Sequence, residues 1–331
     1  MIDPHNSTHA QGRDPTRVTV VGAGLVGGSW AVVFARAGCD VVVHDQDTQQ
    51  MLAAEKWIGQ TLRSLESAGA LRDTVAAILD RISYEPVRSR AVANADHVQE
   101  SIVESLEAKR SLFQRLDHET PAATVLASST SSFPISAIAK DFPGRARCIV
   151  AHPANPPHLI SLTEVCGAPF TAADTIQRTL ALLARIGQAP VLLQQEIDGF
   201  VLNRLQWSLL AEALRLVEEG VITAEDVDRV VSLGLARRWT LMGPLHVGDL
   251  NAPGGLSDYL ARFGPTINRI AESRGASPVA MPEHLLDALR ELQDRAAREP
   301  RAKRLQARDE NLVRLNGVLD PLMAKDNDAL D

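Results

Sequence analysis

Three features are missing from this 331-residue sequence, and each absence excludes a class of protein. The cysteines, Cys39, Cys148 and Cys166, are an odd set without CxxC spacing, so we expect reduced thiols in the cytoplasm and neither a disulfide framework nor a metal site. No run of about 18 apolar residues occurs, so a membrane span is not expected. The net charge of −7 argues against nucleic acid or an anionic membrane as a partner.

The length and composition predict a globular protein. A chain of 331 residues corresponds to about two domains, and 45% hydrophobic and 23% charged residues are ordinary proportions. Residues 1–16 are polar, contain two prolines and have no apolar core, so we expect a flexible leader here and not a signal peptide.

Strands and helices alternate in the first part of the chain. A β-branched run, Val18–Val21, precedes a glycine turn, an expected helix over residues 25–37 and a second strand ending at residue 44. Further strands are expected at residues 97–102, 124–128, 145–151 and 190–194, with helices between them at 106–116, 135–140 and 172–186. This order predicts an α/β fold with a Rossmann-type, doubly wound, mostly parallel sheet over residues 17–197.

The pattern becomes purely helical after about residue 198. Residues 199–219 read as one long, leucine-rich helix, and no convincing strand follows. We therefore expect an all-α C-terminal domain over residues 198–331 that binds substrate. Because such a helix needs a large apolar partner surface, the domain is also expected to form a homodimer.

The glycine turn carries a dinucleotide-binding motif. Gly22, Gly24 and Gly27 fit GxGxxG, in which the glycines allow a tight turn, a close approach of the pyrophosphate and close packing of the helix on the strand. The phosphates would lie at the helix N-terminus, against Leu25 and Val26. The motif alone is weak evidence, but here it follows a strand and opens a helix.

Asp45 follows the second strand, at the position expected of a ribose ligand. Its carboxylate would accept hydrogen bonds from both ribose hydroxyls and would repel a 2′-phosphate. Residues 46–48 offer no arginine to hold that phosphate, so the sequence predicts NAD and not NADP. The alternative is that Asp45 only caps the helix that follows it.

A histidine and a glutamate suggest the chemistry. His152 opens the string HPANPP after an expected strand, and Glu164 follows twelve residues later. A histidine with a carboxylate partner is the usual general base near neutral pH. Beside a nicotinamide, such a base would take the proton of an alcohol while hydride leaves carbon. The alternatives are a structural histidine and a surface acid.

Four segments together resemble the L-3-hydroxyacyl-CoA dehydrogenase superfamily, most closely its branch with L-gulonate 3-dehydrogenase and lambda-crystallin. They are Ser128–Ser132 (SSTSS), His152–Pro157 (HPANPP), Leu162–Val165 (LTEV) and Glu196–Gln206 (EIDGFVLNRLQ). Two positions depart from the superfamily, which often has asparagine where this chain has Ser105 and Ser129. The serine at 129 agrees with the gulonate branch.

The resemblance implies roles for individual residues. His152 would be the general base, and Glu164 would fix its tautomer. Ser131 and Asn203 would hold the reacting oxygen, and Asn155 would orient the turn or the substrate. Ser131 could instead cap the helix after it.

The resemblance also places Glu104 and Lys109 beside the nicotinamide ribose. The alternative for Lys109 is a solvated lysine on a helix surface.

Arg238 precedes an aromatic residue in the stretch GLARRWTLMGP, again as in the gulonate branch. A guanidinium can grip a carboxylate with two hydrogen bonds, so Arg238 could anchor a free acid, unless it only faces solvent or an interface. The resemblance therefore implies NAD-dependent oxidation of the 3-hydroxyl of an L-gulonate-like 3-hydroxy acid to the 3-keto acid.

Two groups of alternatives stay open. The substrate could be a short 3-hydroxyacyl-CoA, carnitine or a diketo ester. The protein could also be a non-catalytic, crystallin-like NAD-binding protein.

Overall fold

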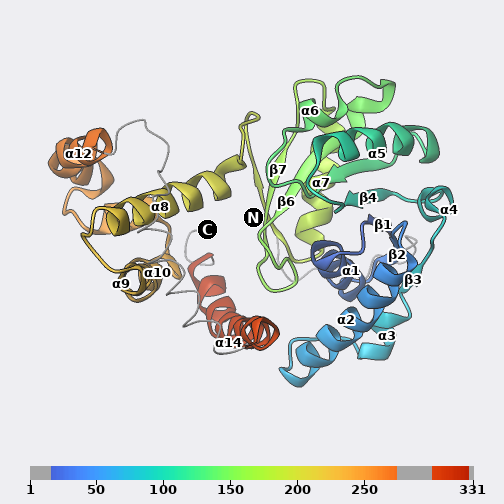
Figure 1. Cartoon of the computed structure of the whole chain (residues 1–331), viewed down its shortest axis with the longest axis horizontal. Helices are drawn as coiled ribbons and strands as arrows, with labels where there is room; N and C mark the ends of the chain where they lie inside the picture. The colour runs from blue at the N-terminus through green and yellow to red at the C-terminus, as the bar shows by residue number, and fades with distance from the viewer. Residues whose placement is uncertain (1–15, 274–299, 328–331) are drawn as a thin grey trace, which may run out of the picture. The chain divides into compact units, whose positions relative to one another are not determined.

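The computed structural model describes residues 16–273 and 300–327. The expected leader, apart from Thr16, lies outside the described residues. The chain divides into two compact units, Met1–Asn203 and Arg204–Asp331 (Figure 1). Helix α8 (Phe200–Glu218) contributes its first residues to the first unit and the rest to the second. The domain boundary expected at residue 198 stays a prediction.

The first unit is built on one eight-stranded sheet with the strand order β3-β2-β1-β4-β5-β6-β7-β8. All neighbouring strands run parallel except β6 and β7, which are antiparallel. This arrangement confirms the predicted Rossmann-type, mostly parallel sheet. The strands are β1 (Arg17–Val21), β2 (Asp40–His44), β3 (Ile82–Tyr84), β4 (His97–Glu100), β5 (Val125–Ser128), β6 (Cys148–Pro153), β7 (Leu162–Cys166) and β8 (Ala189–Leu192).

Helices cover both faces of this sheet (Figure 1). Val21 belongs to a buried cluster with Leu112 and Phe113 of α5, whereas Val20 lies against Gly27 of α1. Because neighbouring residues of a strand point to opposite faces, α1 and α5 pack on opposite sides. The helices of this unit are α1 (Leu25–Arg36), α2 (Thr48–Ser67), α3 (Val75–Leu79), α4 (Arg88–Val92), α5 (Leu106–Glu119), α6 (Ile135–Ala139), the 3₁₀ helix η1 (Pro143–Arg147) and α7 (Ala173–Arg185).

Strands β3 and β7 were not expected from the sequence. β3 has only three residues, too few for a recognisable alternation. β7 contains the LTEV motif, which the sequence pattern did not identify as a strand. Its antiparallel register with β6 places Glu164 directly opposite His152. The two candidate catalytic residues are therefore a cross-strand pair, whose side chains lie within reach of each other.

The second unit is helical, and none of its described residues forms a strand. Besides most of α8, it contains α9 (Ala224–Val230), the π-helix η2 (Val231–Leu235), α10 (Ala236–Trp239), α11 (Pro244–Leu250), α12 (Gly255–Ser273) and α14 (Arg301–Asn327). No helix within the described ranges is both long enough and apolar enough to cross a membrane.

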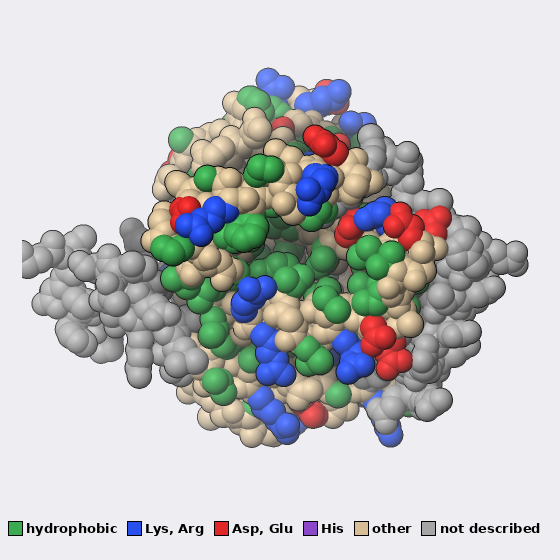
Figure 2. All heavy atoms as spheres, turned by 90° about the vertical axis from the view of Figure 1, so that its left-hand side faces the viewer, with side chains coloured by type: hydrophobic (Ala, Val, Ile, Leu, Met, Phe, Trp, Pro, Cys, Tyr) green, Lys and Arg blue, Asp and Glu red, His purple; other side chains and the backbone are tan. Residues whose placement is uncertain are grey.

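Large hydrophobic side chains are exposed along the second unit. They include Leu205, Trp207 and Leu210 of α8, and Leu260, Phe263, Ile267 and Ile270 of α12. Figure 2 shows hydrophobic side chains gathered on one face of the molecule.

Candidate functional site

The glycine turn between β1 and α1 leaves room for an anion. A Cβ on Gly22, whose φ is 103°, would lie 2.5 Å from the carbonyl oxygen of Ser101, and a Cβ on Gly27 would overlap the carbonyl oxygen of Gly22. A Cβ on Gly24, by contrast, would meet nothing within 4 Å. Gly24 is also the N-cap of α1 and has no side chain to occupy the first N–H groups of that helix. Those groups are available to a phosphate.

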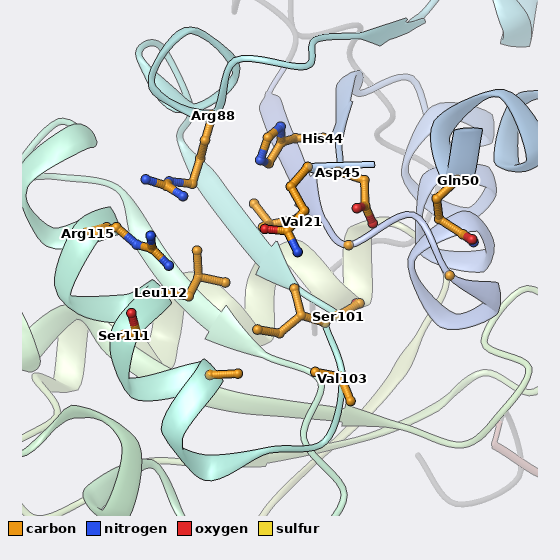
Figure 3. A pocket seen from close by; sticks show the side chains of 15 residues that line it. Val21, His44, Asp45, Gln50, Arg88, Ser101, Val103, Ser111, Leu112 and Arg115 are labelled. Carbon is orange, nitrogen blue, oxygen red and sulfur yellow. The ribbon is translucent and has the colours of Figure 1, made fainter. Parts of the chain in front are cut away.

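A cleft of about 420 Å³ opens beside this turn (Figure 3). It lies at the carboxyl ends of β1, β2 and β4, where the strand order changes direction, which is where doubly wound sheets bind their ligands. Its walls include the turn, the end of β2, the segment after β4 and one side of α5. The residues that line it include Gly22, Gly24, Asp45, Gln50, Arg88, Ser101 and Arg115.

Asp45 faces the cleft and also fixes the turn. Its Oδ2 accepts a hydrogen bond from the N–H of Ala23 at 2.8 Å, and its Oδ1 accepts one from the N–H of Asp47 at 3.0 Å. The alternative that Asp45 caps the next helix is wrong, because Asp47 is the N-cap of α2 and accepts from the N–H of Gln49.

Three side chains at the cleft were missed because they belong to no motif. Gln50 donates to the carbonyl of Ala23 at 3.0 Å, which ties α2 to the turn. Arg88 and Arg115 line the cleft from α4 and α5. Arg88 is held by two hydrogen bonds to Glu119, at 2.7 and 2.8 Å.

His152 and Glu164 form a buried pair. His152 Nδ1 lies 2.9 Å from Glu164 Oε2, and the two residues are 5% and 3% exposed. The other carboxylate oxygen of Glu164 accepts from the N–H groups of Val201 and Leu202, at 2.9 and 3.0 Å, at the start of α8. Burial alone would raise the pKa of Glu164, but the hydrogen bonds from His152 and from these N–H groups together lower it below its ordinary value.

The tautomer of His152 follows from this arrangement. An ionised Glu164 can only accept, so Nδ1 carries the hydrogen of a neutral ring. Nε2 is then the basic nitrogen, and no described residue forms a hydrogen bond with it. The pair is therefore arranged as a base whose reactive nitrogen is available to a ligand.

Phe200 shapes this pair and was not singled out from the sequence. It is buried, and its ring centroid lies 5.3 Å from that of His152. Phe200 has a φ of 50° and follows Gly199, whose φ is 75°, so two successive left-handed residues turn the chain into α8. A left-handed non-glycine residue costs roughly 1–3 kcal/mol and is found mostly where function needs it. Here the turn aims the first N–H groups of α8 at Glu164.

The backbone of Ser131 is held from both sides. Its N–H donates to Glu104 Oε1 at 2.9 Å, and its carbonyl accepts from Asn203 Nδ2 at 2.9 Å. Ser131 Oγ lies 3.5 Å from Glu104 Oε1, at the limit of a hydrogen bond. The alternative that Ser131 caps the next helix is wrong, because Pro134 is the N-cap of α6.

Glu104 gathers several donors at once. Besides Ser131, its Oε1 accepts from Thr130 Oγ1 at 2.6 Å and from the N–H of Ser132 at 3.0 Å, and its Oε2 lies 3.2 Å from Lys109 Nζ. Burial raises the pKa of Glu104, but the Thr130 hydrogen bond and the charge of Lys109 outweigh it, so the pKa lies below its ordinary value.

Lys109 is not the solvated lysine of the alternative interpretation. Its side chain is 1% exposed, and its Nζ lies 2.7 Å from Glu100 Oε1, which is itself fully buried. The sequence did not single out Glu100. Because Lys109 is buried behind Glu104, we expect any effect of Lys109 on the cofactor to pass through Glu104.

Two other predicted residues, and one position that departs from the superfamily, lie apart from this network. Asn155 is exposed on the turn after β6, and Arg238 is exposed on α10 in the second unit. Their roles stay predictions. Ser105 is the N-cap of α5 and accepts from the N–H of Ala108, which gives this departure from the superfamily a structural role.

Known protein families match almost the whole described chain. Residues 17–197 match the sequence model of the 3-hydroxyacyl-CoA dehydrogenase NAD binding domain, and residues 199–291 match that of the 3-hydroxyacyl-CoA dehydrogenase C-terminal domain. The first of these matches confirms NAD as the predicted cofactor.

Individual relatives differ in their named activities. The chain is 41% identical over 263 residues to lambda-crystallin from Oryctolagus cuniculus, covering 79% of this chain and 82% of the relative. It is 37% identical over 255 residues to L-carnitine dehydrogenase from Streptomyces griseus, covering 77% and 75%. A solved structure of 5-formyl-3-hydroxy-2-methylpyridine 4-carboxylic acid 5-dehydrogenase, an NAD+ dependent dismutase, superposes with a TM-score of 0.79 at 26% identity, covering 93% of this chain and 99% of that one.

The two glycines of the turn should respond differently to an added methyl group. Gly24→Ala should leave the thermal unfolding midpoint almost unchanged, because the Cβ meets no protein atom. It should weaken NADH binding about 5- to 150-fold, because the methyl occupies the approach of the phosphates. Calorimetric titration with NADH measures this loss.

Gly27→Ala is the matched control within the same turn. Its Cβ would overlap the Gly22 carbonyl, so it should destabilise the fold by about 1–3 kcal/mol as well as weaken binding. Tight NADH binding by Gly24→Ala would show that the phosphates do not approach the turn there.

The acid stability of the first unit should depend on Glu104. A carboxyl with a folded pKa below its unfolded pKa stabilises the fold above the unfolded value, and this contribution is lost as pH falls through the folded pKa. Because Glu104 is partly exposed and solvent screens its charge, Glu104→Gln should lower the free energy of unfolding at pH 7 by only about 0.5–1.5 kcal/mol. The difference in free energy of unfolding between Glu104→Gln and the wild type should become smaller below about pH 4. Urea unfolding at a series of pH values measures both effects.

Glu66→Gln, at an exposed position of α2, is the control. The free energy of unfolding of this variant should vary with pH as that of the wild type does. A difference between Glu104→Gln and the wild type that stays constant down to pH 3 would contradict the role of the Glu104 charge.

Proposed function

The chain belongs to the 3-hydroxyacyl-CoA dehydrogenase family of NAD-dependent oxidoreductases, and we propose that it oxidises the 3-hydroxyl of a free L-3-hydroxy acid, resembling L-gulonate, to the 3-keto acid. The observation that carries the proposal is the buried His152–Glu164 pair, with Nε2 of the histidine available to a ligand. This pair lies in the same compact unit as the glycine turn that receives the cofactor.

The proton steps follow from the chain's own residues. NAD, when bound, supplies the hydride acceptor. His152 Nε2 takes the hydroxyl proton of the substrate, and Glu164 stabilises the imidazolium that forms. In the reverse direction His152 returns the proton to the ketone.

Ser131 and Asn203 are the proposed contacts to the reacting oxygen. Glu104 and Asn203 hold the backbone of Ser131 in place. The Cα that carries the hydroxyl is therefore fixed, and little of Ser131 has to be ordered when substrate binds. A donor that is already in place stabilises developing charge on oxygen without further reorganisation.

The free acid is favoured by relatives and by one side chain. L-carnitine, the substrate in the name of one relative, is itself a 3-hydroxy acid with a free carboxylate, and the solved neighbour is named for a pyridine carboxylic acid. The lambda-crystallin relative agrees with the gulonate-like motifs. Arg238, exposed on α10, is the proposed partner of the carboxylate.

A short-chain 3-hydroxyacyl-CoA is the second candidate substrate. The observation in its favour is the match of residues 199–291 to the C-terminal domain of the 3-hydroxyacyl-CoA enzymes. A purely structural, crystallin-like protein is the less favoured proposal. It would have no use for a buried charged pair that is costly to desolvate.

A homodimer and a cytoplasmic location complete the proposal. The exposed hydrophobic side chains of α8 and α12 are of the kind that a second copy would cover. The three cysteines are unpaired and buried, as expected in a reducing compartment. The molar mass in solution tests the dimer.

His152→Gln should abolish most turnover without affecting cofactor binding. Loss of the base should lower kcat about 10²- to 10⁴-fold, while the Kd of NADH should stay near the wild-type value. His118→Gln, at an exposed position of α5, is the control and should behave as the wild type. Wild-type turnover by His152→Gln would remove His152 from the mechanism.

Arg238→Met should discriminate between the two substrate classes. If the guanidinium holds a carboxylate, KM for a free 3-hydroxy acid should rise about 10- to 100-fold, while KM for a 3-hydroxyacyl-CoA should not rise. Arg237→Met, at the adjacent exposed position of α10, is the matched control. An unchanged KM for free acids in Arg238→Met would exclude the clamp but leave the His152 chemistry intact.

A further inference from the structure

A row of hydrogen-bonded polar side chains runs from the interior of the sheet to the cofactor cleft. It starts on β4, where Gln99 Nε2 lies 3.3 Å from the carbonyl oxygen of Ala151. Because a carbonyl oxygen can only accept, the amide nitrogen of Gln99 must face it, and Gln99 Oε1 must face His97 Nε2 at 3.1 Å. Burial lowers the pKa of His97 to about 4, so the ring is neutral near pH 7 and carries a hydrogen on Nε2.

Ser129 receives two donors in this row. Gln99 Nε2 lies 2.8 Å from Ser129 Oγ, and the indole N–H of Trp30 lies 3.1 Å from the same oxygen. A hydroxyl oxygen has two lone pairs, and these two N–H groups fill both. Ser129 Oγ has one further neighbour, Ser101 Oγ at 2.9 Å. The hydrogen between the two hydroxyls must therefore belong to Ser129.

The hydroxyl of Ser101 therefore keeps its own hydrogen for another acceptor. Its oxygen accepts from Ser129, and the Ser101 hydroxyl donates to no acceptor among the described residues. Ser101 lines the cofactor cleft and is one of the side chains drawn in Figure 3. We propose that Ser101 is a cofactor-binding residue whose hydroxyl donates to an acceptor oxygen of the dinucleotide.

The position of Ser101 indicates which part of the cofactor it meets. Its backbone abuts the first glycine of the turn, since a Cβ on Gly22 would lie 2.5 Å from the Ser101 carbonyl oxygen. Asp45 is the expected partner of the adenosine ribose, so the acceptor oxygens left for Ser101 are those of the diphosphate and of the nicotinamide-side ribose. Ser101 therefore serves the diphosphate–ribose portion and not the adenine.

The buried row gives this contact its polarity. An isolated serine hydroxyl rotates freely and can either donate or accept. Here Trp30 and Gln99 force Ser129 to donate, and Ser129 in turn leaves Ser101 with its hydrogen free. The contact is thus prepared before the ligand arrives, which reduces the ordering that binding requires. It depends on NAD binding and not on the identity of the substrate.

Ser101→Ala tests the proposal with three probes, NADH, ADP-ribose and adenosine, each titrated calorimetrically. Loss of one hydrogen bond should weaken NADH and ADP-ribose about 2- to 12-fold. Adenosine is the negative probe, because AMP still carries one phosphate of the diphosphate. Adenosine has no phosphate and no nicotinamide-side ribose, so it should bind as it does to the wild type. Titration with ADP separates the two acceptors, because its affinity falls only if the diphosphate accepts the bond.

Two further variants keep the result interpretable. Ser101→Cys preserves the size of the side chain but replaces the hydroxyl with a weak donor, so it should lose affinity as Ser101→Ala does. Ser67→Ala, at the exposed end of α2 where the hydroxyl bonds only its own helix, should change nothing. Unchanged NADH affinity in both Ser101 variants would overturn the proposal, and so would an equal loss of affinity for adenosine.

Discussion

The Glu164 carboxylate serves two parts of the first unit at once. One oxygen is hydrogen-bonded to His152 across the antiparallel pair of strands. The other oxygen accepts hydrogen bonds from two backbone N–H groups at the start of α8. Both partners favour the charged form of the acid, and a charged acid is what fixes the hydrogen on Nδ1 of the imidazole. The base and the entry to the helical unit therefore depend on the same charge. The left-handed backbone of Phe200 is the local cost of bringing them together.

A second carboxylate, that of Glu104, positions the backbone around Ser131. Glu104 accepts hydrogen bonds from backbone N–H groups of the loop after β5. Glu104 is itself held in position by Lys109, which is paired with Glu100 behind it. Placing the Lys109–Glu100 pair out of water costs several kcal/mol, so this pair is weak evidence for stability. Its clearer effect is geometric, because the Ser131 loop is held by charge-assisted bonds that shorten and direct the contact.

Sequence reasoning reached the fold and the main site residues for different reasons. The sheet was predictable because buried parallel strands read as β-branched runs beside glycine turns, and Val18–Val21 is such a run. His152 and Glu164 were found through motifs, yet their pairing depends on the β6–β7 register, which no local pattern encodes. The burial of Lys109 was equally hidden, since a lysine on a helix gives no sign of which carboxylates the fold will bring to it. Glu100, Phe200 and Ser101 were missed because their roles come from tertiary contacts alone.

In the proposed function, the chemistry and the choice of substrate depend on different parts of the chain. The glycine turn, the His152–Glu164 pair, Ser131 and Asn203 all lie before residue 204, within the first compact unit. The chain is similar both to a relative named for L-carnitine and to one named for 3-hydroxyacyl-CoA, so overall similarity does not select the substrate. The difference must come from side chains that reach the rest of the substrate, away from the reacting carbon. In the proposed function the proton-transfer residues lie in the first unit, so an exposed cation of the helical unit such as Arg238 is a better candidate for specificity than those residues.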